Sequence, residues 1–345
     1  MARKDRVIKL NELVKMRTLV TGGAGFIGSH LVDALLLENH EVVVIDDLST
    51  GRVDNLSRGK SNKNLNIFDA SITEKEKISE CFQEIDWVFH LAGLADIVPS
   101  ISNPENYFRV NSLGTMNVLE LSRRNGIKRF IYAASSSCYG IPKLCPTPES
   151  SIIQVEYPYA LTKYLGEECV LHWGKVYDLP VVSLRLFNVY GPRSRTTGTY
   201  GAVFGVFLAQ KINGKPLTVV GDGKQLRDFT FVSDVVNAFL KAADSKVRQQ
   251  IFNVGSGSPQ SVNRLVELLD CKDIEYIPKR PGEPDCTHAD VSKIKEYLGW
   301  EAKTSFPSGV KIMLDNLKDW ENAPLWTSDT IKKETEDWFS KLSDK

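Results

Sequence analysis

The sequence has no excess of charge of either sign and no hydrophobic run long enough to cross a membrane. Lys plus Arg number 43 and Asp plus Glu number 43, so the 345-residue chain has a formal net charge of zero. Proteins that bind the nucleic-acid backbone usually carry a basic excess, and membrane helices need about 18 or more consecutive apolar residues. We therefore expect neither nucleic acid nor a membrane among the partners. The proportions of charged residues (25%) and hydrophobic residues (42%) are those of a soluble globular protein.

Cysteine is scarce, and its spacing excludes two kinds of site. The six cysteines include no Cys-x-x-Cys pair, which is the spacing of thiolate zinc sites, and they do not form the dense pattern of a disulfide framework. We therefore expect no metal, reduced thiols and a cytoplasmic protein. Residues 1–15 contain no continuous apolar segment of the kind that a secretory signal requires. We expect them to form an extension outside the core, either a surface helix or a frayed arm.

Short apolar runs separated by helix-length segments indicate a parallel β-sheet. These runs are continuous rather than alternating, as in strands that are covered on both faces. We therefore predict an α/β fold, a Rossmann-type doubly wound parallel sheet. The runs lie at 17–21, 41–46, 87–91, 129–133, 181–186 and 251–254.

The composition changes after Asn188, where Gly, Pro, Arg and Thr accumulate. We predict a smaller, discontinuous C-terminal lobe that binds the substrate in a cleft beside the sheet. Three of the six tryptophans, at 320, 326 and 338, fall near the end of the chain. We expect a C-terminal helix there that packs on its own chain or on a partner subunit, and nothing in the sequence supports a ligand role for it. The predicted units are an extension (1–15), a Rossmann domain (16–190 and 231–257), a substrate-binding lobe (191–230 and 258–320) and a helical tail (321–345).

Three glycines indicate a dinucleotide site. Gly22, Gly25 and Gly28 follow a predicted strand and lead into a predicted helix, and Asp46 closes the next strand. Glycines allow a pyrophosphate to approach the backbone at the N-terminus of the helix. A carboxylate at the end of the next strand accepts hydrogen bonds from an adenosine ribose and repels a 2′-phosphate. The pattern therefore predicts NAD rather than NADP.

Two Tyr-x-x-x-Lys spacings occur, and only one of them can place both side chains on one helical face. The pair Tyr139 and Lys143 encloses a glycine and a proline, which excludes a regular helical turn. Tyr159 and Lys163 begin a predicted helix, so they lie one turn apart. We expect the ammonium of Lys163 and a cationic nicotinamide ring to favour the phenolate, so that Tyr159 can act as a general base. Ser135, at the end of the 129–133 strand, can relay the proton of a substrate hydroxyl.

With these motifs, the chain resembles the extended short-chain dehydrogenase/reductase family, in its nucleotide-sugar epimerase and dehydratase branch. The resemblance covers roughly residues 16 to 300. It implies a homodimer that pairs helices 104–125 and 159–177 in a four-helix bundle, and a place in carbohydrate metabolism such as polysaccharide biosynthesis. The motifs that carry it are TGGAGFIGSH, HLAG (90–93), NSLGT (111–115), ASSSCYG, RLFNVYGPR (185–193), LRDF (226–229) and RPGEP (280–284).

The resemblance also implies roles for individual residues, with a UDP-sugar as the expected substrate. Tyr159, Lys163 and Ser135 are the expected catalytic residues. The expected cofactor-binding residues are Gly22, Gly25, Phe26, Ile27, Gly28, Asp46, Asp47, Ser49, Thr50, Asp69, Ala70, Leu91, Ala92, Gly93, Asn111, Lys163 and Phe187. The expected substrate-binding residues are Asp96, Ser135, Ser136, Ser137, Tyr159, Asn188, Ala202, Val203, Arg227, Arg280, Glu283 and Thr287.

The residues before Tyr139 separate the reactions of this family. Dehydratases of the family resemble Thr-Asp-Glu at the positions of Ser135, Ser136 and Ser137, and related decarboxylases keep the Glu. Without these carboxylates no evident group can eliminate water between C5 and C6. The sequence therefore favours an isomerase, an NAD-dependent 4-epimerase acting through a transient 4-keto sugar. A 4-dehydrogenase, a 4,6-dehydratase, an epimerase at another carbon and a non-catalytic NAD-binding protein are the alternatives.

Two positions bear on the choice of sugar. Thr287 stands where the family places a gate that is bulky in enzymes restricted to plain hexoses. A small side chain there permits acetamido sugars without requiring them, so both UDP-hexoses and UDP-N-acetylhexosamines remain candidates. Asp96 lies where relatives that prefer acetamido sugars resemble Ser. Its carboxylate would repel a uronate and favour hydroxyl or amine groups, unless the side chain points into solvent.

Overall fold

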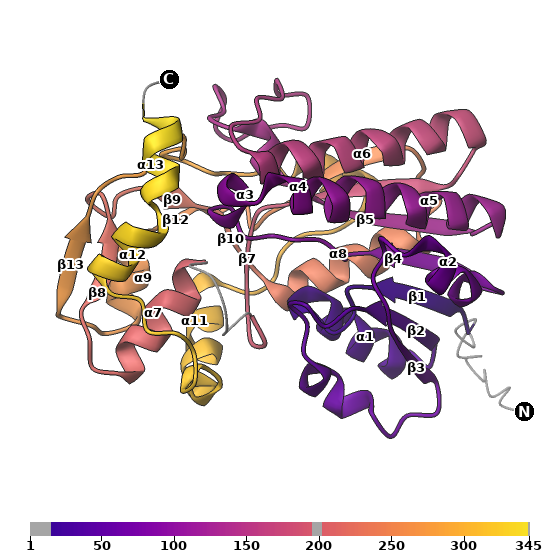
Figure 1. The fold of residues 1–345 in the computed structure, drawn as a ribbon, viewed down its shortest axis with the longest axis horizontal. Coiled ribbons are helices and arrows are strands. Elements are labelled where there is room, and N and C mark those ends of the chain that lie inside the picture. The colour runs from indigo at the N-terminus through magenta and orange to yellow at the C-terminus, as the bar shows by residue number, and fades with distance from the viewer. Residues whose placement is uncertain (1–14, 195–201, 344–345) are drawn as a thin grey trace, which may run out of the picture.

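The computed structural model describes residues 15–194 and 202–343, and it contains a seven-stranded parallel sheet. The strand order is β11-β6-β5-β4-β1-β2-β3 (Figure 1). The predicted extension therefore lies outside the described residues, except for Lys15. The strands are β1 (Arg17–Thr21), β2 (Glu41–Asp46), β3 (Leu65–Asp69), β4 (Trp87–His90), β5 (Arg129–Ser135), β6 (Val181–Leu186) and β11 (Gln250–Val254).

Both faces of the sheet are covered, as the continuous apolar runs predict. Within β1, Val20 packs with helices α1 and α8 on one face, and Leu19 packs with α5 and α6 on the other. The predicted α/β Rossmann-type fold is confirmed. The first layer contains α1 (Phe26–Leu37), α8 (Val232–Asp244) and α10 (Ser292–Leu298), and the second contains α2 (Lys75–Ile78), α5 (Thr115–Arg124) and α6 (Pro158–Tyr177).

Three elements differ from the expectations. The sequence pattern missed β3, whose side chains are mostly exposed because it is an edge strand, so it has no continuous apolar run. The expected helix 104–125 is divided into α4 (Pro104–Tyr107), a π-helical segment η3 (Phe108–Gly114) and α5. The expected single tail helix is two short helices, α12 (Ser328–Glu334) and α13 (Glu336–Leu342).

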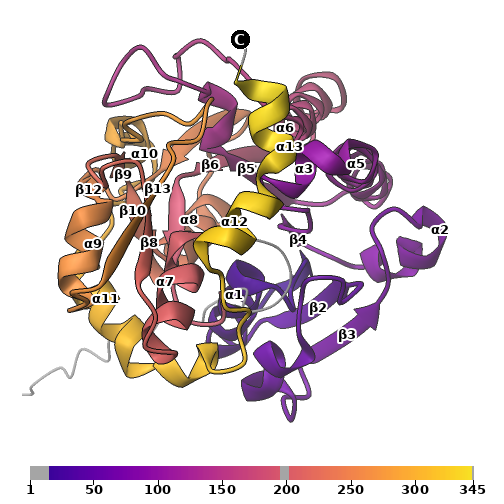
Figure 2. The same cartoon turned by 60° about the vertical axis from the view of Figure 1, so that its left-hand side comes forward.

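A second hydrophobic cluster lies beside the carboxyl edge of the sheet and contains aromatic residues from distant parts of the chain. Phe204, Phe229, Trp320 and Trp338 are all buried in it. Figure 2 shows the C-terminal helices lying across this part of the molecule. The helices there are α7 (Val203–Ile212), α9 (Val262–Leu268), α11 (Phe306–Asp315) and η5 (Leu317–Trp320). The strands are β7 (Asn188–Tyr190), β8 (Leu217–Val220), β9 (Leu226–Arg227), β10 (Phe229–Phe231), β12 (Gln260–Ser261) and β13 (Ile274–Ile277).

The strand order reverses between β1 and β4, which lie side by side although they are not consecutive. The loops that follow these strands leave in opposite directions, and this divergence opens a crevice at the carboxyl edge. Three more short helices lie near that edge: α3 (Pro99–Ser102), η1 (Val53–Gly59) and η4 (Ser136–Tyr139). In the part of the chain that the structure describes, no helix is both long and apolar enough to span a bilayer.

Candidate active site

A cavity of about 650 Å³ lies at the carboxyl edge of the sheet and continues to the second hydrophobic cluster. Its walls include the turn after β1, the ends of β4, β5 and β6, and residues of α7 and β9. Ligands bind at this edge in doubly wound sheets. The cavity therefore joins the predicted cofactor site to the predicted substrate site.

The glycine turn forms one end of the cavity, and its backbone requires glycine at two positions. Gly22 has a φ of +71°, and a Cβ there would lie 2.7 Å from the Ala92 nitrogen. A Cβ on Gly28 would collide with the Gly22 carbonyl oxygen. The N-cap residue Gly25 makes no side-chain cap, so the first-turn N–H groups of α1 have neither a side-chain cap nor an intrahelical partner. Because Phe26, Ile27 and Gly28 line the cavity, this helix end can receive a pyrophosphate.

Asp46 lies at the end of β2, where it lines the cavity although it is only 7% exposed. Its carboxylate accepts hydrogen bonds from the N–H groups of Ala24 and Leu48, each at 2.9 Å. Burial raises its pKa, against the effect of these two bonds. The side chain is thus fixed at the strand end, where a carboxylate can accept ribose hydroxyls and disfavours a 2′-phosphate.

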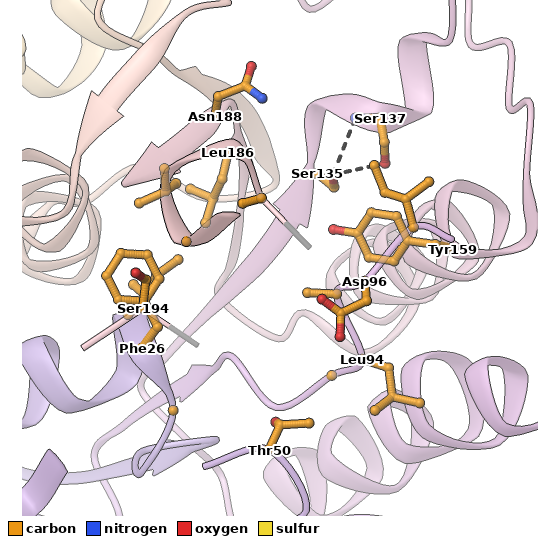
Figure 3. A pocket seen from close by; sticks show the side chains of 18 of the residues that line it. Phe26, Thr50, Leu94, Asp96, Ser135, Ser137, Tyr159, Leu186, Asn188 and Ser194 are labelled. Carbon is orange, nitrogen blue, oxygen red and sulfur yellow. Dashed lines mark hydrogen bonds between the residues drawn. The ribbon is translucent and has the colours of Figure 1, made fainter. Parts of the chain in front are cut away.

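The predicted catalytic group lies in the middle of the cavity (Figure 3). Tyr159, in the first turn of α6, points its hydroxyl toward Ser135 at the end of β5 (Figure 3). Ser135 is close enough for hydrogen bonding to lower the pKa of the phenol. Ser135 Oγ lies 2.8 Å from Ser137 Oγ, so the hydroxyls form a short chain. Asp96 approaches the same tyrosine from the loop after β4.

The electrostatic balance at Tyr159 differs from the expectation. Burial raises its pKa, the hydrogen bond with Ser135 lowers it, and the negative charge of Asp96 raises it further, so the net shift is upward. Lys163 is not among the groups that move it. The predicted phenolate-stabilising role of this ammonium therefore stays a prediction.

Lys163 lies one turn further along α6, with its Nζ 4.5 Å from the centroid of the Tyr132 ring. Burial lowers its pKa to about 7, and the carboxylate of Glu167 partly opposes this effect. Glu167 itself is buried and forms an ion pair with Arg185 at 2.6 Å. Lys163 therefore holds its proton less strongly than an exposed lysine does, at a position that lines the cavity.

Two arginines at the far end of the cavity share one carboxylate. Arg280 Nη2 lies 2.8 Å from Glu283, and Arg227 Nη2 lies 3.7 Å from it. Arg227 also donates hydrogen bonds to the carbonyls of Leu226 and Pro284, which fixes its guanidinium. Burial lowers the pKa of Arg227, and Glu283 opposes that shift. Arg227, Arg280 and Glu283 together carry a net charge of +1, so the two guanidinium groups can hold a diphosphate.

Thr287 lies next to this group, with its hydroxyl turned toward Asn188. The hydroxyl donates to Asn188 Oδ1 at 2.8 Å and accepts from the Asp228 N–H at 3.2 Å. Both Thr287 and Asn188 line the cavity, as expected for residues beside a sugar.

Two of the predicted site residues do not line the cavity. Asp69 is exposed at the end of the edge strand β3, where its neighbour Ala70 lines the wall instead. Asn111 is 1% exposed behind the loop after β4, and it exchanges hydrogen bonds with both backbone groups of Leu94. Its amide therefore supports the loop rather than touching a ligand. The other predicted site residues all line the cavity.

Several residues that line the cavity are not among the predicted site residues. Tyr157 stands two residues before Tyr159, and Ala323, Pro324 and Trp326 come from the C-terminal segment. Nothing in the sequence supported a ligand role for this segment, and in the structure three of its residues line the cavity. Aromatic residues near the chain end were the only signal, and they are equally typical of simple packing.

The comparisons with known proteins agree with this site. Residues 18–255 match the model of the NAD dependent epimerase/dehydratase family. UDP-glucose 4-epimerase of Mycolicibacterium smegmatis is 34% identical over 304 residues, which cover 86% of this chain and 96% of that protein. UDP-glucuronic acid decarboxylase 2 of Arabidopsis thaliana is 34% identical over 313 residues, or 88% of this chain and 68% of that protein.

Solved structures give the same result. UDP-glucose 4-epimerase of Thermotoga maritima with UDP-glucose superposes with a TM-score of 0.82 at 36% identity, over 88% of this chain and 99% of that one. UDP-glucuronic acid 4-epimerase of Bacillus cereus, with UDP-glucuronic acid and NAD, superposes with a TM-score of 0.82 at 31% identity, over the same shares. The chain therefore belongs to the NAD-dependent epimerase/dehydratase family, and its glycine turn and buried aspartate suit that cofactor.

Proposed function

We propose that this protein is a UDP-sugar 4-epimerase. The observation that carries the proposal is the hydroxyl chain of Ser135 and Ser137 beside Tyr159. Serines stand at 136 and 137, the two positions where elimination would require carboxylates. Hydroxyls can pass a proton to and from the 4-hydroxyl of a sugar but cannot remove the C5 proton. Besides hydride transfer, epimerisation at C4 needs only this proton transfer at the 4-hydroxyl and no removal of the C5 proton.

In the proposed reaction, Tyr159 accepts the proton of the 4-hydroxyl through Ser135 and later returns it. The glycine turn and Asp46 would hold NAD⁺, which would supply reversible hydride transfer at C4, to either face of the 4-keto sugar, and a positive charge near Tyr159. Arg227 and Arg280 hold the diphosphate while the keto sugar turns over, so the intermediate stays in the cavity. No net oxidation occurs, and the cofactor is regenerated in each turnover.

The sugar preference follows from the charge near Tyr159. Asp96 places a carboxylate beside the sugar subsite, which disfavours uronates by repulsion. The small side chain of Thr287 leaves room for an acetamido group. We therefore propose UDP-glucose and UDP-N-acetylglucosamine, with their C4 epimers, as substrates and UDP-glucuronate as a poor one.

The test is incubation of the purified protein with UDP-glucose, UDP-N-acetylglucosamine, UDP-glucuronate and dTDP-glucose, with C4 configuration followed by NMR. We expect the galacto-configured products of the first two, without accumulation of NADH, and loss of activity in Tyr159→Phe. A released keto sugar would indicate a dehydratase, and a pentose product a decarboxylase. Either result, or a preference for UDP-glucuronate, would refute the proposal.

We further propose a cytoplasmic homodimer. Apolar side chains are exposed along η3, α5 and the end of α6, including Leu113 (47%), Met116 (42%) and Val176 (52%). The helices α5 and α6 run side by side (Figure 1), and pairing them with a second copy would cover these side chains in a four-helix bundle.

A further inference from the structure

The C-terminal helix α13 is part of the wall that supports the active site. It contacts α3, which directly follows the loop that carries Asp96, and the two helices lie together in Figures 1 and 2. Its Leu342 lies at the 280–284 loop, which contains Arg280, since a Cβ on Gly282 would meet the Leu342 side chain at 4.0 Å. The helix therefore touches one loop that lines the cavity and a helix that directly follows another such loop.

Trp338, in the first turn of α13, makes one polar contact and one aromatic contact with the site. The indole is fully buried, and its Nε1 donates a hydrogen bond to the Pro281 carbonyl at 2.9 Å. Pro281 follows Arg280 in the chain. The same indole packs against the ring of Tyr157, with 5.3 Å between centroids.

Tyr157 connects this contact to the catalytic tyrosine. Its ring is stacked on that of Tyr159, with 6.4 Å between centroids and 8° between planes. Tyr157 is also close enough to the phosphate-site charges for Glu283 and Arg227 to influence its pKa, which burial raises. One indole thus contacts both the loop that holds the diphosphate and the ring that supports the general base.

We propose that Trp338 is a positioning residue, which holds the 280–284 loop through its N–H and the Tyr159 ring through Tyr157. The inference rests on the proposed function, because it assigns the two contacts to a sugar nucleotide's diphosphate and sugar. It also gives the C-terminal segment a role in the site. The two roles can be separated, because phenylalanine keeps an aromatic ring against Tyr157 and lacks the N–H, whereas leucine lacks both.

Trp320 offers a matched control. It is fully buried in the same hydrophobic cluster as Trp338, and its Nε1 has no hydrogen-bond partner among the described residues. The substitutions Trp338→Phe, Trp338→Leu and Trp320→Phe therefore compare equally buried indoles that differ in their contact with the site. Each full-length variant is tested for UDP affinity by calorimetry, and for kcat and KM with UDP-glucose.

We expect Trp338→Phe to weaken UDP binding and raise KM about five- to tenfold, the effect of one lost hydrogen bond, with kcat within about twofold of wild type. Trp338→Leu should also lower kcat, by about tenfold, because the tyrosine stack loses its support. Trp320→Phe should leave all three quantities within about twofold, since the indole N–H that it removes has no hydrogen-bond partner among the described residues. If Trp338→Leu does not fold, Trp338→Phe alone decides the result, through UDP affinity.

Wild-type UDP affinity in Trp338→Phe would overturn the inference, and so would equal losses in Trp338→Phe and Trp320→Phe. UDP binding is measured without turnover, so the two proposals fail in different ways. A wild-type protein that binds UDP but epimerises no UDP-sugar would refute the proposed function alone. One that binds no UDP would refute both.

Discussion

Tyr159 lies between a group that lowers its pKa and a group that raises it, so two substitutions should shift its titration in opposite directions. The hydrogen bond with Ser135 lowers the pKa of the phenol, and the carboxylate of Asp96 raises it. A general base acts in its deprotonated form, so kcat/KM rises with pH until the base is ionised. Ser135→Ala should therefore move this rise to higher pH, and Asp96→Asn should move it to lower pH.

The expected sizes follow from the two interactions. A hydrogen bond to a charged group contributes about 1.5–3 kcal/mol, so Ser135→Ala should lower kcat/KM roughly ten- to hundredfold on the rising part of the profile. A charge beside a cavity that water can enter shifts the pKa of a neighbouring group by about one unit or less, which corresponds to roughly 1.4 kcal/mol. Asp96→Asn should therefore raise kcat/KM at low pH by about tenfold at most.

The assay is the pH dependence of kcat/KM for UDP-glucose, measured from pH 5 to 10 in buffers of constant ionic strength. This quantity reports the free enzyme's titrating groups. Ser137→Ala is the matched control for Ser135→Ala, since it removes a neighbouring hydroxyl that does not bond to the phenol. Shifts in the same direction for Ser135→Ala and Asp96→Asn, or a shift in neither, would refute the assignment of Tyr159 as the base.

Three other substitutions test separate parts of the structure. Glu167→Gln leaves the Arg185 guanidinium buried without its carboxylate, so the free energy of unfolding in urea should fall by about 3 kcal/mol or more; a loss below about 1 kcal/mol would contradict this. Thr287→Tyr should fill the space beside Asn188. In the NMR assay it should reduce turnover of UDP-N-acetylglucosamine at least tenfold more than turnover of UDP-glucose. Equal losses would show that Thr287 does not select between acetamido sugars and plain hexoses. Met116→Glu places a charge on the exposed face of α5 and should give monomers in sedimentation velocity; an unchanged sedimentation coefficient would place any dimer interface elsewhere.

The parts of the site that the sequence predicted well are those in which a local pattern has one physical cause. Gly22 and Gly28 are required where a Cβ would collide with neighbouring backbone, and that requirement is visible as a spacing along the chain. Asp46 follows from the end of a buried strand, and Tyr159 with Lys163 from one helical turn. Each of these predictions needs only the local conformation and the position of the carboxyl edge of the sheet.

The electrostatics of Tyr159 could not be predicted in this way, because they depend on three segments that are distant in sequence. Tyr159 lies in α6, Ser135 in β5 and Asp96 in the loop after β4. Burial of the Tyr159 side chain has the largest effect on its pKa. A helical spacing places Lys163 near Tyr159 but does not say which side chain the ammonium faces. In the folded protein it faces the ring of Tyr132 instead.

Asn111 and Trp338 are two further residues whose roles could not be predicted from the sequence, because those roles depend on the residues that they contact. Both were visible in the sequence, one within the motif NSLGT and the other in a tryptophan-rich tail, and both act on the site through other residues. Asn111 exchanges two hydrogen bonds with the Leu94 backbone, and Trp338 contacts Pro281 and Tyr157. A residue that lines a cavity can be recognised from a motif, but a residue that holds the cavity wall is recognised only once the wall is known. The family model matches residues 18–255 and so does not include the C-terminal segment. The contribution of this segment to the cavity wall therefore becomes visible only in the folded structure.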